Sequence, residues 1–405
     1  MIHVVGGTYW ETCHFPHWRQ CFGSGGRAAA VLSGLSDAVV LHTYCGETGR
    51  RDREALAACF SLELGNVVAA EEVAFEYLHP LAPKSVQPSR KEIGSTALLK
   101  VEAPTVLRFG CWEADPLVHA ETVVYDPQSP EAPLRYDANG STANRLAIVC
   151  NKAEGGLLTG ESDPKEIGRV LIKDHCAEVA IIKLGPCGAL VCSSEAATAI
   201  PAYATERVFP IGSGDVFSAV FTHYWAEKAL DPRLAADLAS RASAWYCATQ
   251  TFPRGEGWLE DSPIEWRPLP KYPTIVPARV YLAGPFFTIQ QLWVVEEALS
   301  AIEAMGVSVF SPYHDVGSST SACEIASKDL DGLRTCQAVL AIIDGWDPGT
   351  LFEVGYARAL GIPVIALVQK RNGTDLKMLE GTSVSLERDL ASAVYKTVWA
   401  AISAA

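Results

Sequence analysis

The chain has 405 residues, which exceeds the size of one ordinary domain and is enough for two. Hydrophobic residues make up 49% of it and charged residues 20%, so the chain can fill compact cores and is not disordered. The 33 Lys and Arg residues against 47 Asp and Glu residues give a net charge of −14. This balance argues against a nucleic-acid-binding protein, which needs a basic face to neutralise phosphates.

Neither a membrane protein nor a secreted one is expected. No apolar run approaches the roughly 18 to 20 residues of a membrane helix, and the first segment, MIHVVGGTYWETC, lacks the basic and long apolar regions of a secretory signal. The 12 cysteines include no CxxC pair, and the 9 histidines form no HExxH motif. We therefore predict a cytoplasmic protein with reduced cysteines, without disulfides or a structural metal.

In chain order, residues 1–257 come first and predict an α/β domain. Helical patterns occupy 26–35 and 216–229. The predicted strands are the short apolar runs at 38–41, 122–125, 146–150 and 179–184. Buried strands that alternate with helices predict a parallel sheet covered by helices on both faces.

A proline-rich stretch follows at 258–277 and separates this domain from residues 278–405. It contains five prolines and little periodicity, which predicts a stiff linker. The remaining residues predict a second, smaller α/β domain. Its predicted strands lie at 279–283, 307–310, 338–343 and 363–368.

The first domain has neither a GxxxxGK[ST] loop nor a GxGxxG motif after a strand, so it is not predicted to be a P-loop or Rossmann domain. Instead, Gly212, Ser213, Gly214 and Asp215 stand directly before a helical pattern. Glycines at a helix start let backbone N–H groups converge on an anion. Asp215 could then take the proton of a hydroxyl that attacks a phosphoryl group. Alternatively, Ser213 or Asp215 simply caps the helix.

With three further segments, this motif resembles the ribokinase-like (PfkB) family of sugar and nucleoside kinases over roughly residues 1–257. The segments are 23–29 (GSGGRAA), 151–154 (NKAE) and 183–189 (KLGPCGA). The resemblance implies a three-layer α/β/α fold that uses ATP and Mg²⁺. Asp215 would be the catalytic base, and Gly212, Ser213 and Gly214 would hold the anion.

The same resemblance implies a nucleotide site. Asn151 and Glu154 match the N-x-x-E motif, which helps to place Mg²⁺ through water, and Lys183, Gly185 and Gly188 belong to the segment that covers the phosphates. The alternative is that Asn151 and Glu154 form a strand-end turn with a surface acid.

The acceptor side departs from the family pattern. Gly25 and Gly26 match the glycine pair that faces the acceptor, but Arg27 replaces the Asn that commonly follows. Glu11 stands where the family usually has an Asp that grips acceptor hydroxyls, and it could instead be a solvated loop residue. These departures leave the acceptor, and the activity of this domain, open.

In the second domain, Asp344, Asp347 and Glu353 follow a buried apolar run and precede a helical pattern. Ligand sites of open α/β sheets lie at such carboxyl ends of strands, and crowded carboxylates usually serve acid, base or nucleophile chemistry. Alternatively, Thr350 and Glu353 form a capping box at the helix start.

Residues 279–370 are similar to the nucleoside 2-deoxyribosyltransferase family, most closely at D-x-G-T-x-x-E-x-G-Y-A (347–357). The resemblance implies a flavodoxin- or Rossmann-like parallel fold without a cofactor, in a homo-oligomer. Glu353 would be the nucleophile that attacks C1′, and Tyr281 would orient it. Asp347 and Asp329 would bind the nucleobase and move its proton.

The remaining candidates in this domain are substrate contacts. Gly284, Phe286 and Gly349 are expected beside the substrate, and the segment after Gly284 has no Arg, which favours an uncharged 5′ end. His314 could join the pocket or be structural. Asp331 and Asp344 are expected to be supporting or solvated residues.

Together, the two resemblances predict a bifunctional enzyme of nucleoside metabolism that acts on small molecules. One domain would phosphorylate a sugar or nucleoside, and the other would cleave or exchange an N-glycosidic bond by transfer or hydrolysis. One alternative is an effector that hydrolyses NAD or nucleotides and whose kinase-like domain senses a ligand. Another is a kinase-like scaffold without catalysis.

Overall fold

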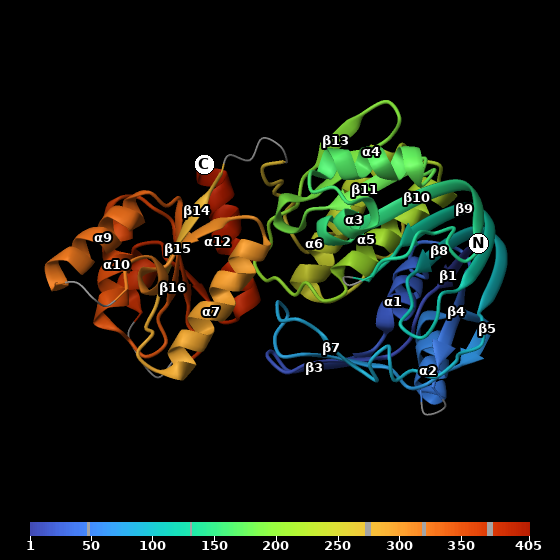
Figure 1. Cartoon of the computed structure of the whole chain (residues 1–405), viewed down its shortest axis with the longest axis horizontal. Coiled ribbons are helices and arrows are strands. Elements are labelled where there is room, and N and C mark those ends of the chain that lie inside the picture. The colour runs from blue at the N-terminus through green and yellow to red at the C-terminus, as the bar shows by residue number, and fades with distance from the viewer. Residues whose placement is uncertain (47–48, 130–131, 272–276, 318–320, 371–375) are drawn as a thin grey trace. The chain divides into compact units, whose positions relative to one another are not determined.

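The computed structural model describes residues 1–46, 49–129, 132–271, 277–317, 321–370 and 376–405 (Figure 1). These residues form two compact units. The first unit comprises Met1–Thr205 with Phe209–Pro268, and the second comprises Glu206–Val208 with Leu269–Ala405. Each unit is an α/β fold with its own main sheet, as predicted.

Nine strands among the described residues form the main sheet of the first unit, in the order β13-β12-β11-β10-β9-β8-β1-β4-β5. They are β1 (Ile2–Val5), β4 (Val39–Cys45), β5 (Glu63–Ala69), β8 (Lys100–Phe109), β9 (Leu117–Asp126), β10 (Thr142–Asn151), β11 (Val179–Lys183), β12 (Ala189–Cys192) and β13 (Ala197–Ile200). Neighbours from β5 to β11 are parallel, whereas β12 and β13 pair antiparallel. The four predicted strands are confirmed, but the sheet is mixed because the short turn η1 (Gly185–Cys187) returns the chain beside β11.

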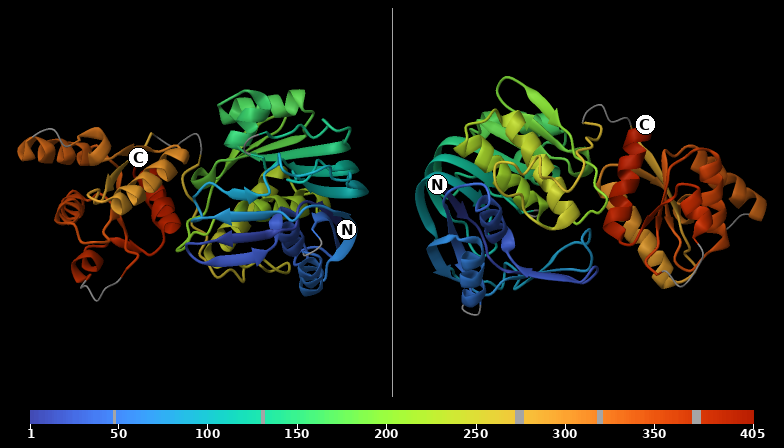
Figure 2. Two further views of the ribbon diagram at one scale, coloured as in Figure 1. Left: turned by 60° about the horizontal axis from the view of Figure 1, so that its bottom comes forward. Right: turned by 180° about the vertical axis from the view of Figure 1, so that it is seen from behind.

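Helices cover both faces of this sheet (Figures 1 and 2). On one face, α1 (Gly23–Leu32), α5 (Ser213–Phe221) and α6 (Pro232–Thr249) pack together, with α2 (Arg50–Phe60) beside α1. On the other face lie α3 (Lys152–Thr159) and α4 (Pro164–Asp174). The helix predicted at 216–229 begins earlier, and its continuation, η2 (Thr222–Glu227), is π-helical.

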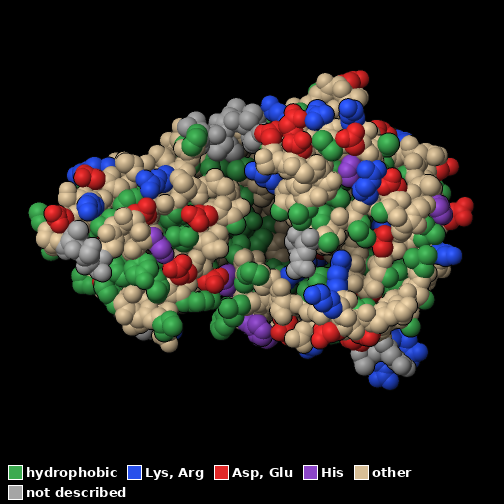
Figure 3. Space-filling model, viewed as in Figure 1, with side chains coloured by type: hydrophobic (Ala, Val, Ile, Leu, Met, Phe, Trp, Pro, Cys, Tyr) green, Lys and Arg blue, Asp and Glu red, His purple; other side chains and the backbone are tan. Residues whose placement is uncertain are grey.

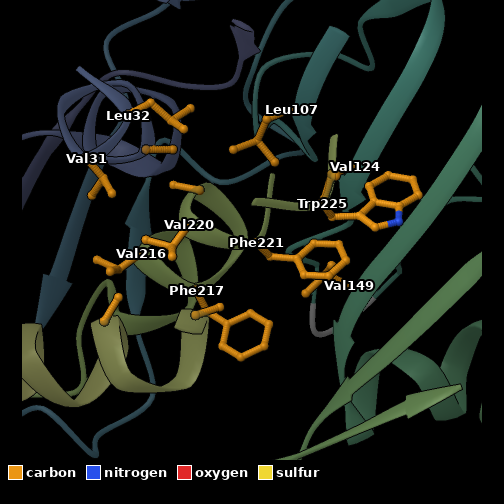
Figure 4. Packing of buried hydrophobic residues seen from close by; sticks show 14 of the residues in the cluster. Val31, Leu32, Leu107, Val124, Val149, Val216, Phe217, Val220, Phe221 and Trp225 are labelled. Carbon is orange, nitrogen blue, oxygen red and sulfur yellow. The ribbon is translucent and has the colours of Figure 1, made fainter. Parts of the chain in front are cut away.

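The core between the sheet and α5 follows the two-residue period of the strands. Val149 of β10 lies beside Phe221 of α5, and Val124 of β9 lies beside Trp225, which follows α5 (Figure 4). The neighbouring Cys150 instead faces α3, where its Sγ would lie 3.2 Å from a Cβ at Gly155. This alternation explains why both faces of β10 are apolar.

A smaller sheet in the first unit was not predicted. Its strand order is β3-β2-β6-β7. The strands are β2 (Trp10–Cys13), β3 (Trp18–Cys21), β6 (Ala74–Tyr77) and β7 (Ser85–Gln87). Because β2 follows β1 after four residues, the chain leaves the main sheet and carries Glu11 into this second layer.

The second unit contains a parallel sheet, as predicted, with the strand order β15-β14-β16-β17-β18, of which β18 was not predicted. Its strands are β14 (Arg279–Ala283), β15 (Ser308–Phe310), β16 (Ala338–Ile342), β17 (Val364–Leu367) and β18 (Ser385–Glu387). Its helices are α7 (Ile289–Ala304), α8 (Pro312–Asp315), α9 (Ala322–Arg334), α10 (Pro348–Ala359), α11 (Lys377–Gly381) and α12 (Leu390–Ala404). From β14 the chain first adds β15 on one side of the sheet and then crosses to add β16 on the other side. Ligands of such sheets bind at this switch point between β14 and β16.

The predicted linker 258–277 begins too early. Trp258 is 1% exposed, lies in the core of the first unit and donates a hydrogen bond from Nε1 to the Tyr224 hydroxyl at 2.9 Å. Leu259 and Trp266 pack against the same core. Residues 258–268 therefore belong to the first unit, and residues 272–276 of the predicted linker lie outside the described residues.

The described surface is mixed in character. On the face in Figure 3, acidic and basic side chains are interspersed, with hydrophobic side chains between them. Among the described residues, none of the helices combines the length and the apolar character that crossing a membrane requires.

Candidate active sites

A cavity of about 270 Å³ lies in the first unit at the carboxyl ends of β9, β10 and β11. Residues of the main sheet, the smaller sheet and the start of α5 line it. They are Tyr9, Glu11, Ser24, Phe75, Tyr77, Lys84, Asp126, Gln128, Asn151, Glu154, Lys183, Gly212, Gly214 and Asp215. The fold thus brings together residues from most of the segments that the sequence singled out.

Asp215 lies in the first turn of α5 and is 5% exposed. The helix begins at Ser213 after Gly212, and neither Ser213 nor Asp215 caps it, so the capping alternative is wrong. Gly212 has a φ of +85°, and a Cβ there would lie 2.3 Å from Arg27 Nε. Only glycine fits this position.

Arg27 joins two predicted site residues. Its Nη1 donates to Asp215 Oδ2 at 2.5 Å, and its Nη2 donates to Glu11 Oε2 at 2.5 Å. Burial alone would lower the pKa of Arg27, but Glu11 and other neighbours raise it well above its ordinary value, so the guanidinium is charged. Glu11 is 4% exposed, which rules out a solvated loop residue, and burial raises its pKa although Arg27 opposes the change.

Gln128 holds the other oxygen of Asp215. Its Nε2 donates to Asp215 Oδ1, and its Oε1 accepts from Ser24 Oγ. Gln128 has a φ of +46°, which is uncommon for a residue with a side chain. Gln128 was not among the predicted site residues, although it stands two residues after Asp126, the last residue of β9.

A second charged group lines the same cavity. Lys183 Nζ and Ser218 Oγ both donate to Asp126 Oδ2 at 2.7 Å, while Asp126 Oδ1 is buried without a partner among the described residues. Burial raises the pKa of Asp126 and of Glu154, and Lys183 opposes both shifts. Asn151 and Glu154 form a capping box at the start of α3, but Glu154 is 4% exposed and is not a surface acid.

Four of the predicted glycines do not line this cavity. Gly25 and Gly26 lie in α1, where a Cβ would meet Gly6 O at 2.6 Å and a Leu56 methyl at 2.9 Å, respectively. Gly185 and Gly188 flank the η1 turn, and a Cβ at Gly188 would lie 2.0 Å from Ile200 O. Gly25 and Gly188 therefore lie close to other backbone atoms, whereas nothing lies within 4 Å of a Cβ built at Gly185.

In the second unit, Tyr281 and Glu353 form the centre of the site. Tyr281 is fully buried on β14, and its hydroxyl donates to Glu353 Oε1 on α10 at 2.6 Å. The alternative of a capping box formed by Thr350 and Glu353 is wrong, because Asp347 caps α10. Its Oδ2 accepts from Thr350 N at 2.7 Å and from Thr350 Oγ1 at 2.9 Å.

Two further carboxylates influence Glu353. The pKa of Glu353 is raised to about 7: burial is the main cause, the Tyr281 hydrogen bond opposes the rise, and the charges of Asp329 and Asp347 add to it. Asp329 Oδ1 is buried without a partner among the described residues, and burial raises the pKa of Asp329. The structure therefore brings together one tyrosine and three acids from three predicted segments of the sequence.

The polar residues around this group have structural partners. His314 contacts Ser311 Oγ and Glu296 Oε1, each at 2.9 Å, as in the structural alternative. Asp344 accepts from the backbone N–H groups that follow β17, and Asp331 pairs with Arg334 at 2.5 Å on the surface.

The predicted substrate contacts lie at the carboxyl edge of the sheet. Phe286 packs against the rings of Phe287 and Tyr313, with centroids 5.0 and 5.2 Å apart. Gly284 follows β14, where a Cβ would lie 3.2 Å from Ile342 Cβ. Gly349 lies in the first turn of α10, where a Cβ would lie 3.1 Å from Asp347 Oδ2.

Several solved structures resemble the first part of the chain. The ribokinase of Thermotoga maritima is 15% identical, with a TM-score of 0.49, and the match covers 64% of this chain and 98% of that one. The nucleoside kinase of Methanocaldococcus jannaschii is 14% identical, with a TM-score of 0.46 and coverages of 64% and 96%. The fructokinase of Vibrio cholerae, with bound fructose, ADP and calcium, is 14% identical, with a TM-score of 0.45 and coverages of 62% and 94%. No curated protein matches the chain.

Two family models match separate parts of the sequence. Residues 119–251 match the pfkB family carbohydrate kinase, and residues 280–386 match the nucleoside 2-deoxyribosyltransferase. The first match contains Asp126, Lys183 and Asp215, and the second contains Tyr281 and Glu353. The chain therefore joins a pfkB-family carbohydrate kinase segment to a segment of the nucleoside 2-deoxyribosyltransferase family.

Proposed function

We propose that the second unit cleaves or exchanges the N-glycosidic bond of a nucleoside or deoxynucleoside, with Glu353 as the nucleophile. The observation that carries this proposal is the hydrogen bond from the buried Tyr281 hydroxyl to Glu353 at 2.6 Å. It holds one carboxylate oxygen in place at the switch point of the sheet. The family match over residues 280–386 supports the class of reaction.

In the proposed reaction, a Glu353 oxygen bonds to C1′ of the sugar while the bond from C1′ to the base nitrogen breaks. The electron pair leaves with the base, and Asp329 or Asp347 supplies the proton that makes the base a better leaving group. A second base or water then attacks C1′ from the opposite face, and the ester bond to Glu353 breaks. The two inversions give net retention.

Base release is the direct test. The protein is incubated with deoxynucleosides, nucleotides or NAD, each with and without a free base, and the products are separated by chromatography. A new nucleoside indicates transfer, free base alone indicates hydrolysis, and nicotinamide indicates NAD cleavage. Glu353→Gln should abolish release, whereas Glu303→Gln, on an exposed face of α7, should not. Undiminished release by Glu353→Gln would contradict the proposal.

For the first unit, we propose transfer of the γ-phosphoryl group of ATP to a hydroxyl of a sugar or nucleoside. Asp215 and Lys183 line one cavity, so a base and a phosphate-binding cation face the same space. Asp215 would take the proton of the acceptor hydroxyl. At the same time the hydroxyl oxygen would bond to the γ-phosphorus, and the bond from that phosphorus to the leaving ADP oxygen would break. Lys183 would attract the phosphate oxygens.

The residues present fit a magnesium ion. Asp126 Oδ1 is buried without a partner among the described residues, and Glu154 lines the same cavity. Carboxylate oxygens and water are the ligands that Mg²⁺ prefers. Glu154, Asn151 and Asp126 would hold the ion, partly through water, and the ion would neutralise phosphate charge. Among the described residues, no three His, Cys, Asp or Glu side chains form a metal-binding group by themselves.

The kinase proposal is tested by ADP formation with a panel of pentoses and nucleosides. Asp215→Asn should lower the rate to background, whereas Asp261→Asn, at an exposed position, should leave it unchanged. ATP that binds but yields no ADP with any acceptor would instead favour a ligand-sensing role for this unit.

A further inference from the structure

The Arg27 side chain lies between Asp215, the proposed base, and Glu11, which the sequence predicts to lie beside the acceptor. Glu11 comes from β2 and Asp215 from α5, and the guanidinium, which comes from α1, donates to both at 2.5 Å. Arg27 is 1% exposed, so these two contacts are buried and are not a solvent-exposed ion pair.

Both oxygens of Asp215 are already engaged. Oδ2 accepts from Arg27, and Oδ1 accepts from Gln128, which is itself held by Ser24. A general base must come within hydrogen-bond reach of the proton that it removes. Asp215 and Gln128 line the cavity, so a hydroxyl in it would meet a carboxylate whose two oxygens already accept from the guanidinium and from the Gln128 amide.

The neighbourhood is shaped for the guanidinium. A Cβ at Gly212 would lie between 2.3 and 2.6 Å from three of its atoms, so the absence of a side chain there makes the close approach possible. Removal of Arg27 from this position would leave Glu11 and Asp215 as buried carboxylates without their cation, which is costly. The ion pair is therefore the resting arrangement of the site.

We propose that Arg27 restrains phosphoryl transfer in the first unit. Asp215 receives the proton of an acceptor hydroxyl only in molecules whose Arg27–Asp215 ion pair has opened, so the observed rate is scaled by the open fraction. This inference rests on the proposed kinase function. It makes Arg27 a negative determinant of turnover and not a residue that the reaction needs.

Arg27→Asn is the decisive variant, because it removes the cation that contacts Asp215 and Glu11 and keeps a polar side chain at this position. With ATP, Mg²⁺ and the panel of pentoses and nucleosides, ADP formation should rise about tenfold or more if fewer than about one molecule in ten is open at rest. Arg27→Lys keeps a cation near Asp215 and should remain close to wild type. The double variant Arg27→Asn with Asp215→Asn should lose the gain.

A gain of rate separates restraint from a structural role, because loss of a merely structural arginine can only lower activity. Arg27→Gln, which keeps amide donors for Glu11, provides a second variant if Arg27→Asn does not fold. A folded Arg27→Asn or Arg27→Gln protein that binds ATP but turns over no faster than an active wild type would overturn the proposal.

Carboxyl labelling gives a readout that does not depend on turnover. A water-soluble carbodiimide with an amine modifies accessible carboxylates, and mass spectrometry reports the modification of Asp215. We expect more labelling of Asp215 in Arg27→Asn than in wild type, and equal labelling would refute the restraint. Increased labelling without ADP formation in any variant would contradict the kinase proposal, but it would still support the contact between Arg27 and Asp215.

Discussion

Replacement of Tyr281 by Phe tests whether its hydroxyl controls the ionisation of Glu353. The hydroxyl donates to Glu353 at 2.6 Å, and the pKa of Glu353 is raised by burial to about 7 although this bond opposes the rise. A hydrogen bond to a charged group contributes about 1.5–3 kcal/mol, and about 1.4 kcal/mol corresponds to one pH unit. The substitution should therefore raise the pKa of Glu353 by a further one to two pH units, roughly.

The pH dependence of base release measures this change. Nucleophilic attack needs the ionised carboxylate, so the first turnover accelerates as the pH rises through the pKa of Glu353. In wild type the acid limb should lie near pH 7, and in Tyr281→Phe it should lie about one to two pH units higher. Rapid-quench chromatography across the neutral range locates both limbs. Phe keeps the stacking of this ring on Phe310, at 5.5 Å between centroids.

Tyr356→Phe is the matched control. Tyr356 lies on the same helix as Glu353, but its hydroxyl accepts from Arg334. Its acid limb should stay at the wild-type position. If the limb of Tyr281→Phe is unchanged or moves to lower pH, the hydrogen bond does not favour the ionised form of Glu353, and the reasoning fails.

Three further predictions concern stability. The pKa of Glu353 is raised from 4.5 to about 7, mainly by burial. The folded protein therefore holds this proton more tightly than the unfolded chain, and the resulting stability is complete below about pH 4.5 and is lost as the pH rises to about 7. Glu353→Gln should therefore gain up to about 3 kcal/mol in free energy of unfolding at pH 8 and little at pH 4, by urea titration. Asp347→Ala should cost about 1 kcal/mol because it removes the cap on Thr350 N, while Asp347→Asn should keep the cap and still slow base release. Trp258→Ala should cost about 3–5 kcal/mol; a loss below about 1 kcal/mol would contradict its place in the core.

The second unit was the more predictable from its sequence. Its strands are short apolar runs separated by helices, and Glu353 and Tyr281 each stand in a local motif that follows or lies within a strand. What local pattern could not decide was the partner of each side chain. Thr350 and Glu353 have the spacing of a capping box, yet Asp347 caps the helix because it lies at the position where the backbone is still extended.

In the first unit, the local sequence pattern does not predict the contacts between residues that are far apart in the chain. The contact from Arg27 to Asp215 joins residues 188 positions apart, and that from Gln128 to Asp215 joins residues 87 apart. The position of Gln128 after a strand end marks it as a candidate for the site, but a single sequence does not indicate which distant residue each side chain contacts. The smaller sheet was missed for the same reason, since β2 and β6 are short and pair across more than sixty residues.

The span of the Arg27–Asp215 contact also sets the time at which the first site can exist. At about 5–20 residues per second, the ribosome needs roughly 10 to 40 s to add the 188 positions from Arg27 to Asp215. During that interval α1 has been made but α5, against which it packs, has not. A nascent chain that stops short of α5 would hold an arginine with only one of its two counter-charges, and a chaperone would meet that helix with its apolar face still uncovered.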